Sequence, residues 1–388
     1  MFKCIGVFLG LFCLLAQTSA EQPDGKRSKS VFEGLSGIKK KTGVFNLYLN
    51  THASFNAYFR EGDPEEAAFK FNQLRIEATG QVNDWISYRW RQMLNASNQA
   101  QSLDNLPHSI DYAGIGFRLT PQFLIFAGKQ CTAFGGFEFD ANPIEIYEYS
   151  DMVNYINCFL TGIDFAYRVT PTQEIRFQIV DSRTGSLEDM FGKLPEGIEK
   201  SKAPLGYSLN WNGILWKGLI KTRWSVSLFN DAKRKYMYYY AAGTELVWKR
   251  FSMYFDFMYS KEALDREGII SRILYEADEE TRALNTRYIS YVAKLNYRFY
   301  PKWNVFLKGM YETASVYKQN GNLAAGKYRT SYGYLGGIEF YPLEDDLHFF
   351  LTWVGRSYDF TSKAREWGAG NYDTQRLSVG FIYKIPLF

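Results

Sequence analysis

The chain has 388 residues, of which 18% are aromatic and 22% are charged, and its formal net charge is +4 at pH 7. Its mean hydropathy is -0.29, and beyond residue 20 no stretch holds the roughly 18 consecutive apolar residues that a spanning helix needs. These values exclude a helical membrane protein. A large soluble β-domain and a β-barrel with a polar interior both remain open.

The N-terminus has the pattern of an export signal. Lys3 gives a positive start, residues 5–16 are almost wholly apolar, and Thr18-Ser19-Ala20 is a small-residue cleavage site. This arrangement predicts a secretory signal peptide over residues 1–20, because the apolar run is too short for a membrane anchor.

A basic stretch follows the signal. It contains Lys26-Arg27, Lys29 and Lys39-Lys40-Lys41, and it invites a nucleic-acid interpretation. An exported protein meets no cytosolic nucleic acid, so we expect residues 21–42 to form a periplasmic basic N-terminal segment. Residues 43–388 are then expected to form one β-domain.

Apolar and polar side chains alternate along that domain. In the first stretch, Phe45, Leu47, Leu49, Ala53, Phe55, Ala57 and Phe59 share one parity, and Asn46, Tyr48, Asn50, His52, Ser54, Asn56 and Tyr58 share the other. The same two-residue period recurs over 220–228, 251–260, 290–299 and 377–385, and the chain ends at Phe388. Soluble strands average about 5–6 residues, so runs this long favour the wall of an outer-membrane β-barrel over a soluble β-sandwich.

The connections between these stretches alternate in length. Short ones lie near 80–84, 120–122, 170–173, 213–216, 248–250, 300–302 and 341–346, and long ones near 60–68, 95–108, 131–158, 181–204, 260–286, 315–328 and 358–374, with a shorter member near 230–235. This pattern predicts an all-β, antiparallel transmembrane barrel of about 16 strands with short periplasmic turns and long extracellular loops.

Parity assigns the charged side chains to the lumen. The inner face is expected to carry Arg75, Arg89, Arg91, Arg118, Arg168, Arg176, Lys221, Arg223, Lys294, Arg298, Lys308 and Arg356. It should carry fewer acids, namely Glu77, Asp164, Glu174, Glu245, Asp256, Glu312 and Glu339. A basic surplus inside a low-dielectric wall concentrates anions. Alternatively, these residues form ordinary lumen ion pairs that select no solute.

The long connection 131–158 is the candidate constriction. Gly135-Gly136 permits a sharp bend, which would let the segment fold into the lumen instead of forming an exposed loop. The expected constriction residues are Lys129, Phe137, Glu138, Asp140, Glu145, Tyr147, Glu148, Tyr149 and Asp151. Cys131 and Cys158 bracket it, and they either form a disulfide or stay as free thiols.

Around this segment the chain resembles the phosphate-selective porin O/P family. The matching stretches are Ala127-Gly-Lys-Gln130, Phe134-Gly-Gly-Phe137, Pro143 through Tyr149-Ser-Asp151, Phe159-Leu-Thr-Gly162 and Asp181-Ser-Arg183. The resemblance implies about 16 strands, a loop folded into the lumen, a frequent homotrimer and passive diffusion of small solutes. It also implies anion or phosphate selectivity from lumen arginines and lysines. This chain departs from that chemistry in having an acidic candidate constriction.

No enzyme motif accompanies these features. The histidines are His52, His108 and His348, without a recognisable nucleophile arrangement, and we expect no cofactor, no metal and no catalytic residue. The sequence predicts a porin in the outer membrane of a Gram-negative cell, contacting lipid and admitting small hydrophilic solutes, with phosphate as one candidate anion. The alternative is a non-conducting barrel that acts as a surface binding or assembly protein.

Overall fold

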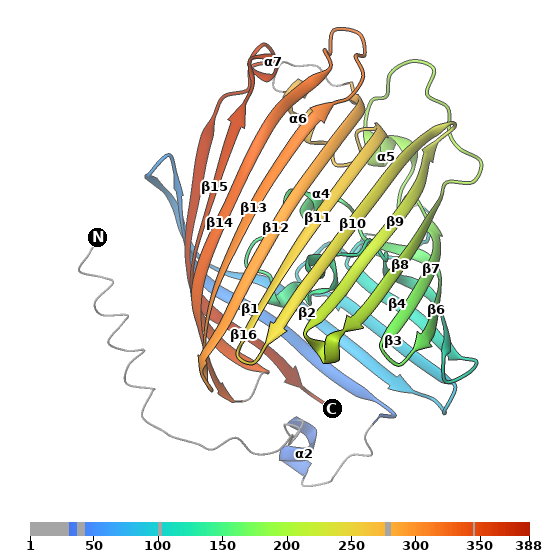
Figure 1. Cartoon of the computed structure of the whole chain (residues 1–388), viewed down its shortest axis with the longest axis vertical. Coiled ribbons are helices and arrows are strands. Elements are labelled where there is room, and N and C mark those ends of the chain that lie inside the picture. The colour runs from blue at the N-terminus through green and yellow to red at the C-terminus, as the bar shows by residue number, and fades with distance from the viewer. Residues whose placement is uncertain (1–30, 37–42, 100–102, 276–280, 344–345) are drawn as a thin grey trace.

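A computed structural model describes residues 31–36, 43–99, 103–275, 281–343 and 346–388 of the chain (Figure 1). The expected signal peptide and most of the expected basic segment lie outside these residues. Within that segment, helix α2 (Val31–Ser36) is described, and its Phe32 ring lies 4.8 Å from the ring of Phe388 at the C-terminus.

The described residues form sixteen antiparallel strands that close into one barrel, in which each strand pairs with its neighbours in sequence and β16 pairs with β1. The first eight are β1 (Asn46–Arg60), β2 (Asp63–Gln81), β3 (Ile86–Met93), β4 (Ile110–Arg118), β5 (Phe123–Cys131), β6 (Phe159–Thr170), β7 (Gln173–Asp181) and β8 (Leu205–Leu215). The others are β9 (Ile220–Ala232), β10 (Lys235–Trp248), β11 (Phe251–Leu264), β12 (Leu284–Tyr300), β13 (Trp303–Val316), β14 (Gly326–Leu343), β15 (Leu347–Phe360) and β16 (Tyr372–Pro386). The predicted fold class and strand number are confirmed.

The two-residue period of the sequence separates the two faces of the wall. In β13, Phe306, Lys308 and Met310 are buried inside the barrel, whereas Leu307 between them is 60% exposed on the outside. Outward aromatic side chains line up across neighbouring strands, because Tyr291 pairs in register with Tyr311, and Tyr311 with Tyr332. The wall is therefore apolar outside and mixed inside, as a lipid-embedded barrel requires.

Short and long connections lie at opposite ends of the barrel (Figure 1). The prediction of a long loop near residues 60–68 is wrong. β1 and β2 are joined by Glu61 and Gly62 alone, both at positive φ (52° and 91°), which is the geometry of a two-residue hairpin turn. β2 pairs with β3 only from Arg75 onward, so the hairpin extends beyond the neighbouring strand. Its charged residues Asp63, Glu65, Glu66 and Lys70 gave this stretch the composition of a loop.

The helices lie in the long connections. Between β5 and β6 are α3 (Phe137–Asp140), the 3-10 turn η1 (Pro143–Glu145) and α4 (Asp151–Tyr155), and α4 lies inside the ring of strands (Figure 1). The later connections carry α5 (Leu187–Phe191), α6 (Ile269–Tyr275) and α7 (Ser362–Arg365); the turn η2 (Trp216–Gly218) joins β8 to β9. Among the described helices, none has both the length and the apolar character needed to cross a membrane.

The apolar core lies inside the barrel on one side. Side chains from β9 to β16, including Tyr239, Phe306 and Phe350, pack with Phe134 and Met152 from the connection between β5 and β6. This half of the lumen is therefore filled by protein. The larger open space lies against the opposite wall.

We predict that Phe306→Ala lowers the free energy of unfolding by about 3–5 kcal/mol, because it leaves a cavity in this core. Urea unfolding in lipid vesicles measures the loss. Leu307→Ala on the same strand is the matched control, and it should cost less because lipid chains fill the space that the outward side chain leaves. Equal losses for the two variants would contradict the packed interior.

Candidate solute pathway

Residues 132–158, the inner loop, fold into the barrel and pack on the inward faces of the later strands. The Tyr147 ring stacks on Phe306 of β13, with centroids 5.0 Å apart and planes at 7°. Phe134 makes an edge contact with Tyr239 of β10 at 4.9 Å. Gly135 and Gly136, at φ 72° and 83°, turn the chain between these contacts. The apolar side chains of the inner loop thus complete the core of the barrel.

Polar contacts fix the same loop from its backbone and its side chains. The N–H groups of Phe137 and Glu138 each donate to the Asp256 carboxylate of β11 at 2.9 Å. The Glu138 carboxylate pairs with Lys308 of β13 at 2.5 Å. The Tyr147 hydroxyl donates to Glu339 of β14 at 2.7 Å. Each contact joins the loop to a different strand, so together they define its position.

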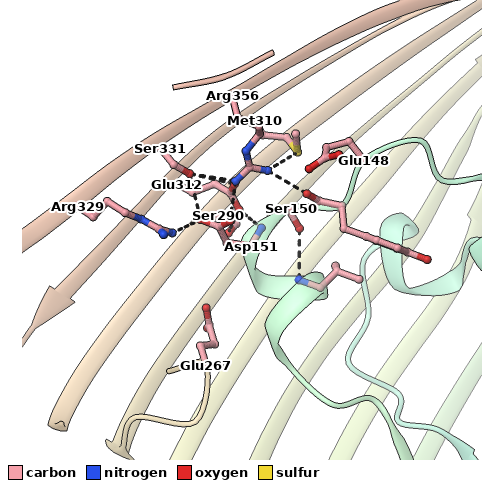
Figure 2. Close-up of polar contacts among 12 residues, drawn as sticks. Glu148, Ser150, Asp151, Glu267, Ser290, Met310, Glu312, Arg329, Ser331 and Arg356 are labelled. Carbon is pink, nitrogen blue, oxygen red and sulfur yellow. Dashed lines mark hydrogen bonds and ion pairs between the residues drawn. The ribbon is translucent and has the colours of Figure 1, made fainter. Parts of the chain in front are cut away.

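Asp151 at the start of α4 belongs to a network of ion pairs and hydrogen bonds (Figure 2). Nη2 of Arg356 lies 2.6 Å from Oδ1 of Asp151 and 2.9 Å from Oε2 of Glu312, and Arg329 pairs with Oδ2 of Asp151. The Asp151 N–H also donates to Glu312 at 2.6 Å. Burial acts to raise the pKa of Asp151, but Arg329 and Arg356 bring that pKa below its usual value. The network therefore holds α4 with charges that compensate each other.

The expected acidic constriction is largely neutralised by the wall. Glu138 and Asp151 have the partners described above, Asp140 pairs with Arg223 of β9, and Glu148 lies 3.2 Å from Arg376 of β16. Glu145 lies exposed on η1. The inner loop thus does not present a row of uncompensated carboxylates to a solute, and its acidic composition alone does not argue against anion passage.

A cavity of about 1280 Å³ separates the inner loop from the wall formed by the early strands. It extends along β3 from Ser87 to Met93, and so over the height of that strand. Its wall side is lined by Arg75, Glu77, Arg89, Arg91, Asp111, Tyr112, Asp164 and Arg176, and its loop side includes Tyr149, Asn154 and Asn157. We call it the main cavity. A smaller space of about 170 Å³ lies between Tyr147 and His52, Gln73 and Arg376.

Arginines outnumber their carboxylate partners in the main cavity. Oδ2 of Asp111 accepts from Nε of both Arg75 (2.7 Å) and Arg91 (2.9 Å), so one carboxylate serves two guanidinium groups. Arg89 pairs with Glu77 at 2.8 Å and Arg176 with Asp164 at 2.6 Å. The Arg89 and Arg176 side chains are 36% and 32% exposed, so both are accessible from the cavity. The local surplus of positive charge favours anions.

The other expected lumen cations lie elsewhere. Arg223, Lys308 and Arg356 bind the inner loop. The other five that do not line the main cavity are Arg118 and Arg168 near the short turns, Lys221 paired with Glu245 at 2.8 Å, Lys294 against the Phe306 ring, and Arg298 over the Tyr341 ring. Of the twelve predicted, four (Arg75, Arg89, Arg91 and Arg176) line the main cavity.

Three further expected residues have placements that the sequence did not reveal. Lys129 pairs with Asp104 of the connection between β3 and β4 at 3.3 Å, and both side chains are buried. Cys131 and Cys158 carry free thiols in this structure. Their hydrogen bond, together with burial, raises the pKa of the Cys158 thiol well above its usual value.

Sequence reasoning missed Asp111, Arg329 and Arg376. Asp111 lies beside a register shift between β3 and β4, and Arg329 lies beside one between β13 and β14, so two-residue counting misplaces them. Arg376 lies in regular strand on β16. Its parity with Ser378 and Gly380 was a usable signal that it faces inward.

A family model described as phosphate-selective porin O and P matches residues 45–385 of the chain. The comparison with curated protein sequences gave no match. Among solved structures, the outer membrane channel DcaP of Acinetobacter baumannii is similar with a TM-score of 0.61 and 13% identity, covering 89% of this chain and 99% of that chain. At this identity the similarity concerns the fold.

Two further solved structures share the fold. An anion-selective porin from Comamonas acidovorans has a TM-score of 0.58 and 9% identity, covering 88% of this chain and 99% of that chain. OmpT of Vibrio cholerae, in a trimer form, has a TM-score of 0.53 and 10% identity, covering 88% of this chain and 100% of that chain.

We predict that Arg356→Met destabilises the protein by about 3–5 kcal/mol, because Asp151 and Glu312 then remain buried with Arg329 as their nearest cation. Protease cleavage within the inner loop of the protein in lipid vesicles should also increase, and mass spectrometry of the fragments measures it. Arg365→Met, at an exposed position of α7, is the control and should stay within about 0.5 kcal/mol of wild type. A stable variant with a protected inner loop would show that this network does not hold α4.

Proposed function

This chain belongs to the phosphate-selective porin O and P family, and from that membership we propose that it is a porin for passive diffusion of small hydrophilic solutes with a preference for anions. Its place is the outer membrane, where its outward apolar side chains meet lipid. The short turns face the periplasm and the long connections face outside. An export signal over residues 1–20 fits this location.

The observation that carries the anion preference is the charge balance of the main cavity. Arg75 and Arg91 share Asp111, while Arg89 and Arg176 remain partly accessible. A solute anion that approaches these groups meets a field of positive sign in a space with low-dielectric walls. The inner loop on the other side has most of its carboxylates paired with the wall. The wall arginines, which Glu77, Asp111 and Asp164 compensate only in part, therefore set the sign of the field in the cavity.

Phosphate is one solute of this class. Guanidinium groups bind phosphate and carboxylate oxygens through paired N–H donors. Each cavity arginine already pairs with a carboxylate of the protein. A passing anion would therefore compete with that carboxylate for the guanidinium group and would not fill an empty site. Such exchange suits transport, because a solute held too tightly does not leave. We propose weak and transient contacts with Arg89 and Arg176.

We also propose that the barrel assembles as a homotrimer through the wall of β3, β4 and β5. These strands have 8, 9 and 9 residues, at or below the roughly 9–11 that a tilted spanning strand needs. Outward Trp90 and Ile115 on this wall are exposed. A second copy against this wall would cover it where the strands are too short to span the lipid. The trimer form of the similar OmpT supports the proposal.

The alternative is a barrel that binds a surface partner and conducts nothing. The apolar packing that fills one half of the lumen favours it, and the main cavity along β3 favours the porin. Planar-bilayer recording separates the two. Steady conductance supports the porin, and its absence in a correctly folded sample supports the binding protein.

We predict that Arg89→Glu combined with Arg176→Glu moves the reversal potential in a KCl gradient toward the cation side. The anion-to-cation permeability ratio should fall by about twofold or more, because the cavity loses its positive surplus. Lys202→Glu makes the same kind of charge change on an exposed part of the β7–β8 connection and should leave the ratio unchanged. An unaltered ratio in the double variant would remove both arginines from the selectivity argument.

A further inference from the structure

The connection between β11 and β12 also folds inward. Residues 265–275, the inward segment, include α6, whose Ile269, Ile270 and Ile273 are buried in the same apolar core as the inner loop. The Arg272 guanidinium lies 3.9 Å from the centre of the Tyr155 ring in α4. Tyr155 lines the main cavity. The inward segment therefore supports the element that forms one side of the solute pathway.

Three carboxylates lie buried where this segment begins. Glu262 accepts from the Arg266 N–H at 2.5 Å and from the Ser260 hydroxyl at 2.6 Å. Asp265 accepts from the N–H and hydroxyl of Ser271 at 2.7 and 2.6 Å. Glu267 differs, because it is 4% exposed and neither of its carboxylate oxygens has a hydrogen-bond partner. A buried ionised carboxylate without partners is costly, and protonation relieves that cost.

The groups around Glu267 increase this cost. It interacts electrostatically with Glu262 of β11, Asp265 of its own connection, Asp151 of α4, Glu312 of β13, Tyr239 of β10 and Tyr288 of β12. The nearby cations contact other groups: Arg329 pairs with Asp151, Arg356 with Asp151 and Glu312, and Arg266 with Asp231 at 2.6 Å. Arg272 and Arg282 donate to backbone carbonyls of the segment, those of Glu267 and Arg266, each at 3.2 Å, and not to the Glu267 carboxylate. Figure 2 shows Glu267 directed toward the Asp151 network without a dashed contact to it.

A bound metal ion is not the compensating charge that this geometry suggests. Across the described ranges, no three or more His, Cys, Asp or Glu side chains are arranged to hold one. Two ways to relieve the repulsion remain, namely protonation of Glu267 or movement of the inward segment away from Asp151 and Glu312.

We propose that the inward segment is a pH-responsive latch on the inner loop, docked while Glu267 is protonated and released when Glu267 ionises. Release removes Arg272 from Tyr155 and the α6 side chains from the core. α4 then loses its contact with the inward segment and stays held by the Asp151 network, and the main cavity widens at Tyr155. The latch itself rests on the contacts above, and its effect on conductance rests on the proposed porin function.

The direction of the pH dependence follows from the carboxyl group. Burial, followed by Glu262 and Asp151, raises the pKa of Glu267 well above its ordinary value of 4.5. A carboxyl with a raised pKa stabilises the docked state fully below its ordinary pKa, and this stabilisation is lost as the pH rises through the raised pKa. Between the ordinary and the raised pKa each pH unit changes the docking equilibrium by about tenfold, as expected for one proton, and above the raised pKa the equilibrium changes no further.

Hydrogen exchange measured by mass spectrometry on the full chain in lipid vesicles tests the latch. After correction for the intrinsic pH dependence of exchange, protection of peptides within 265–275 should fall by up to about tenfold per unit as the pH is raised from about 5 to 9. Peptides of β13 report whether the barrel stays intact and should remain protected. Protection of 265–275 that does not change with pH while β13 stays protected would overturn the proposal.

Glu267→Gln removes the ionisation and keeps the size of the side chain. Protection of 265–275 in this variant should stay high and constant with pH. Glu196→Gln makes the same change at an exposed position between β7 and β8 and should retain the wild-type pH dependence. If Glu267→Gln retains it as well, another group controls the segment and the latch at Glu267 is excluded. If this variant fails to fold, the wild-type measurement still decides.

Bilayer recording separates this proposal from the proposed function. In a conducting protein, wild-type conductance should rise with pH in the range where protection falls, and that of Glu267→Gln should not. Absence of conductance at every pH would count against the porin, while the exchange data would still judge the latch. If the protection of residues 265–275 changes with pH but the conductance does not, then the inward segment does not control the main cavity.

Discussion

The structure depends on compensating charge inside a space with little water. The inner loop brings carboxylates into the barrel, where an unpaired charge is costly. Different strands of the wall supply the compensating cations, including Lys308 of β13, Arg356 of β15 and Arg376 of β16. Because each pair joins the loop to another strand, the pairs determine where the loop lies. They also divide the lumen into a packed half and an open half.

That division gives the inward basic residues two separate roles. On the side of β9 to β16 they hold the inner loop, and their charge is used within the protein. On the side of β2 to β7 they line the main cavity, where Asp111 compensates only part of the charge of Arg75 and Arg91. A count of lumen arginines and lysines therefore overestimates the field that a solute experiences, because much of the charge of the first group is used in holding the inner loop.

The sequence predicted the wall well because the two-residue period follows directly from strand geometry. It failed where the backbone departs from that geometry, as at Asp111 and Arg329 beside register shifts. It also failed where charged residues occupy a strand that is paired on one side only, as in the β1–β2 hairpin. The partners of the inner loop were not predictable, because pairs such as Glu138 with Lys308 join residues far apart in sequence. Periodicity indicates which way a side chain points. Which residues distant in sequence become partners is known only once the barrel is closed.

The β1–β2 hairpin has a consequence for the behaviour of the protein outside the lipid. Since no described strand pairs with the far side of β2 before Arg75, residues 63–70 present a bare β-edge that could act as a template for aggregation. Asp63, Glu65, Glu66 and Lys70 occupy this stretch, with Lys70 and Glu66 paired at 3.1 Å. Charged side chains along an edge discourage another strand from adding to it. The same residues that made this segment look like a loop thus protect it as a strand.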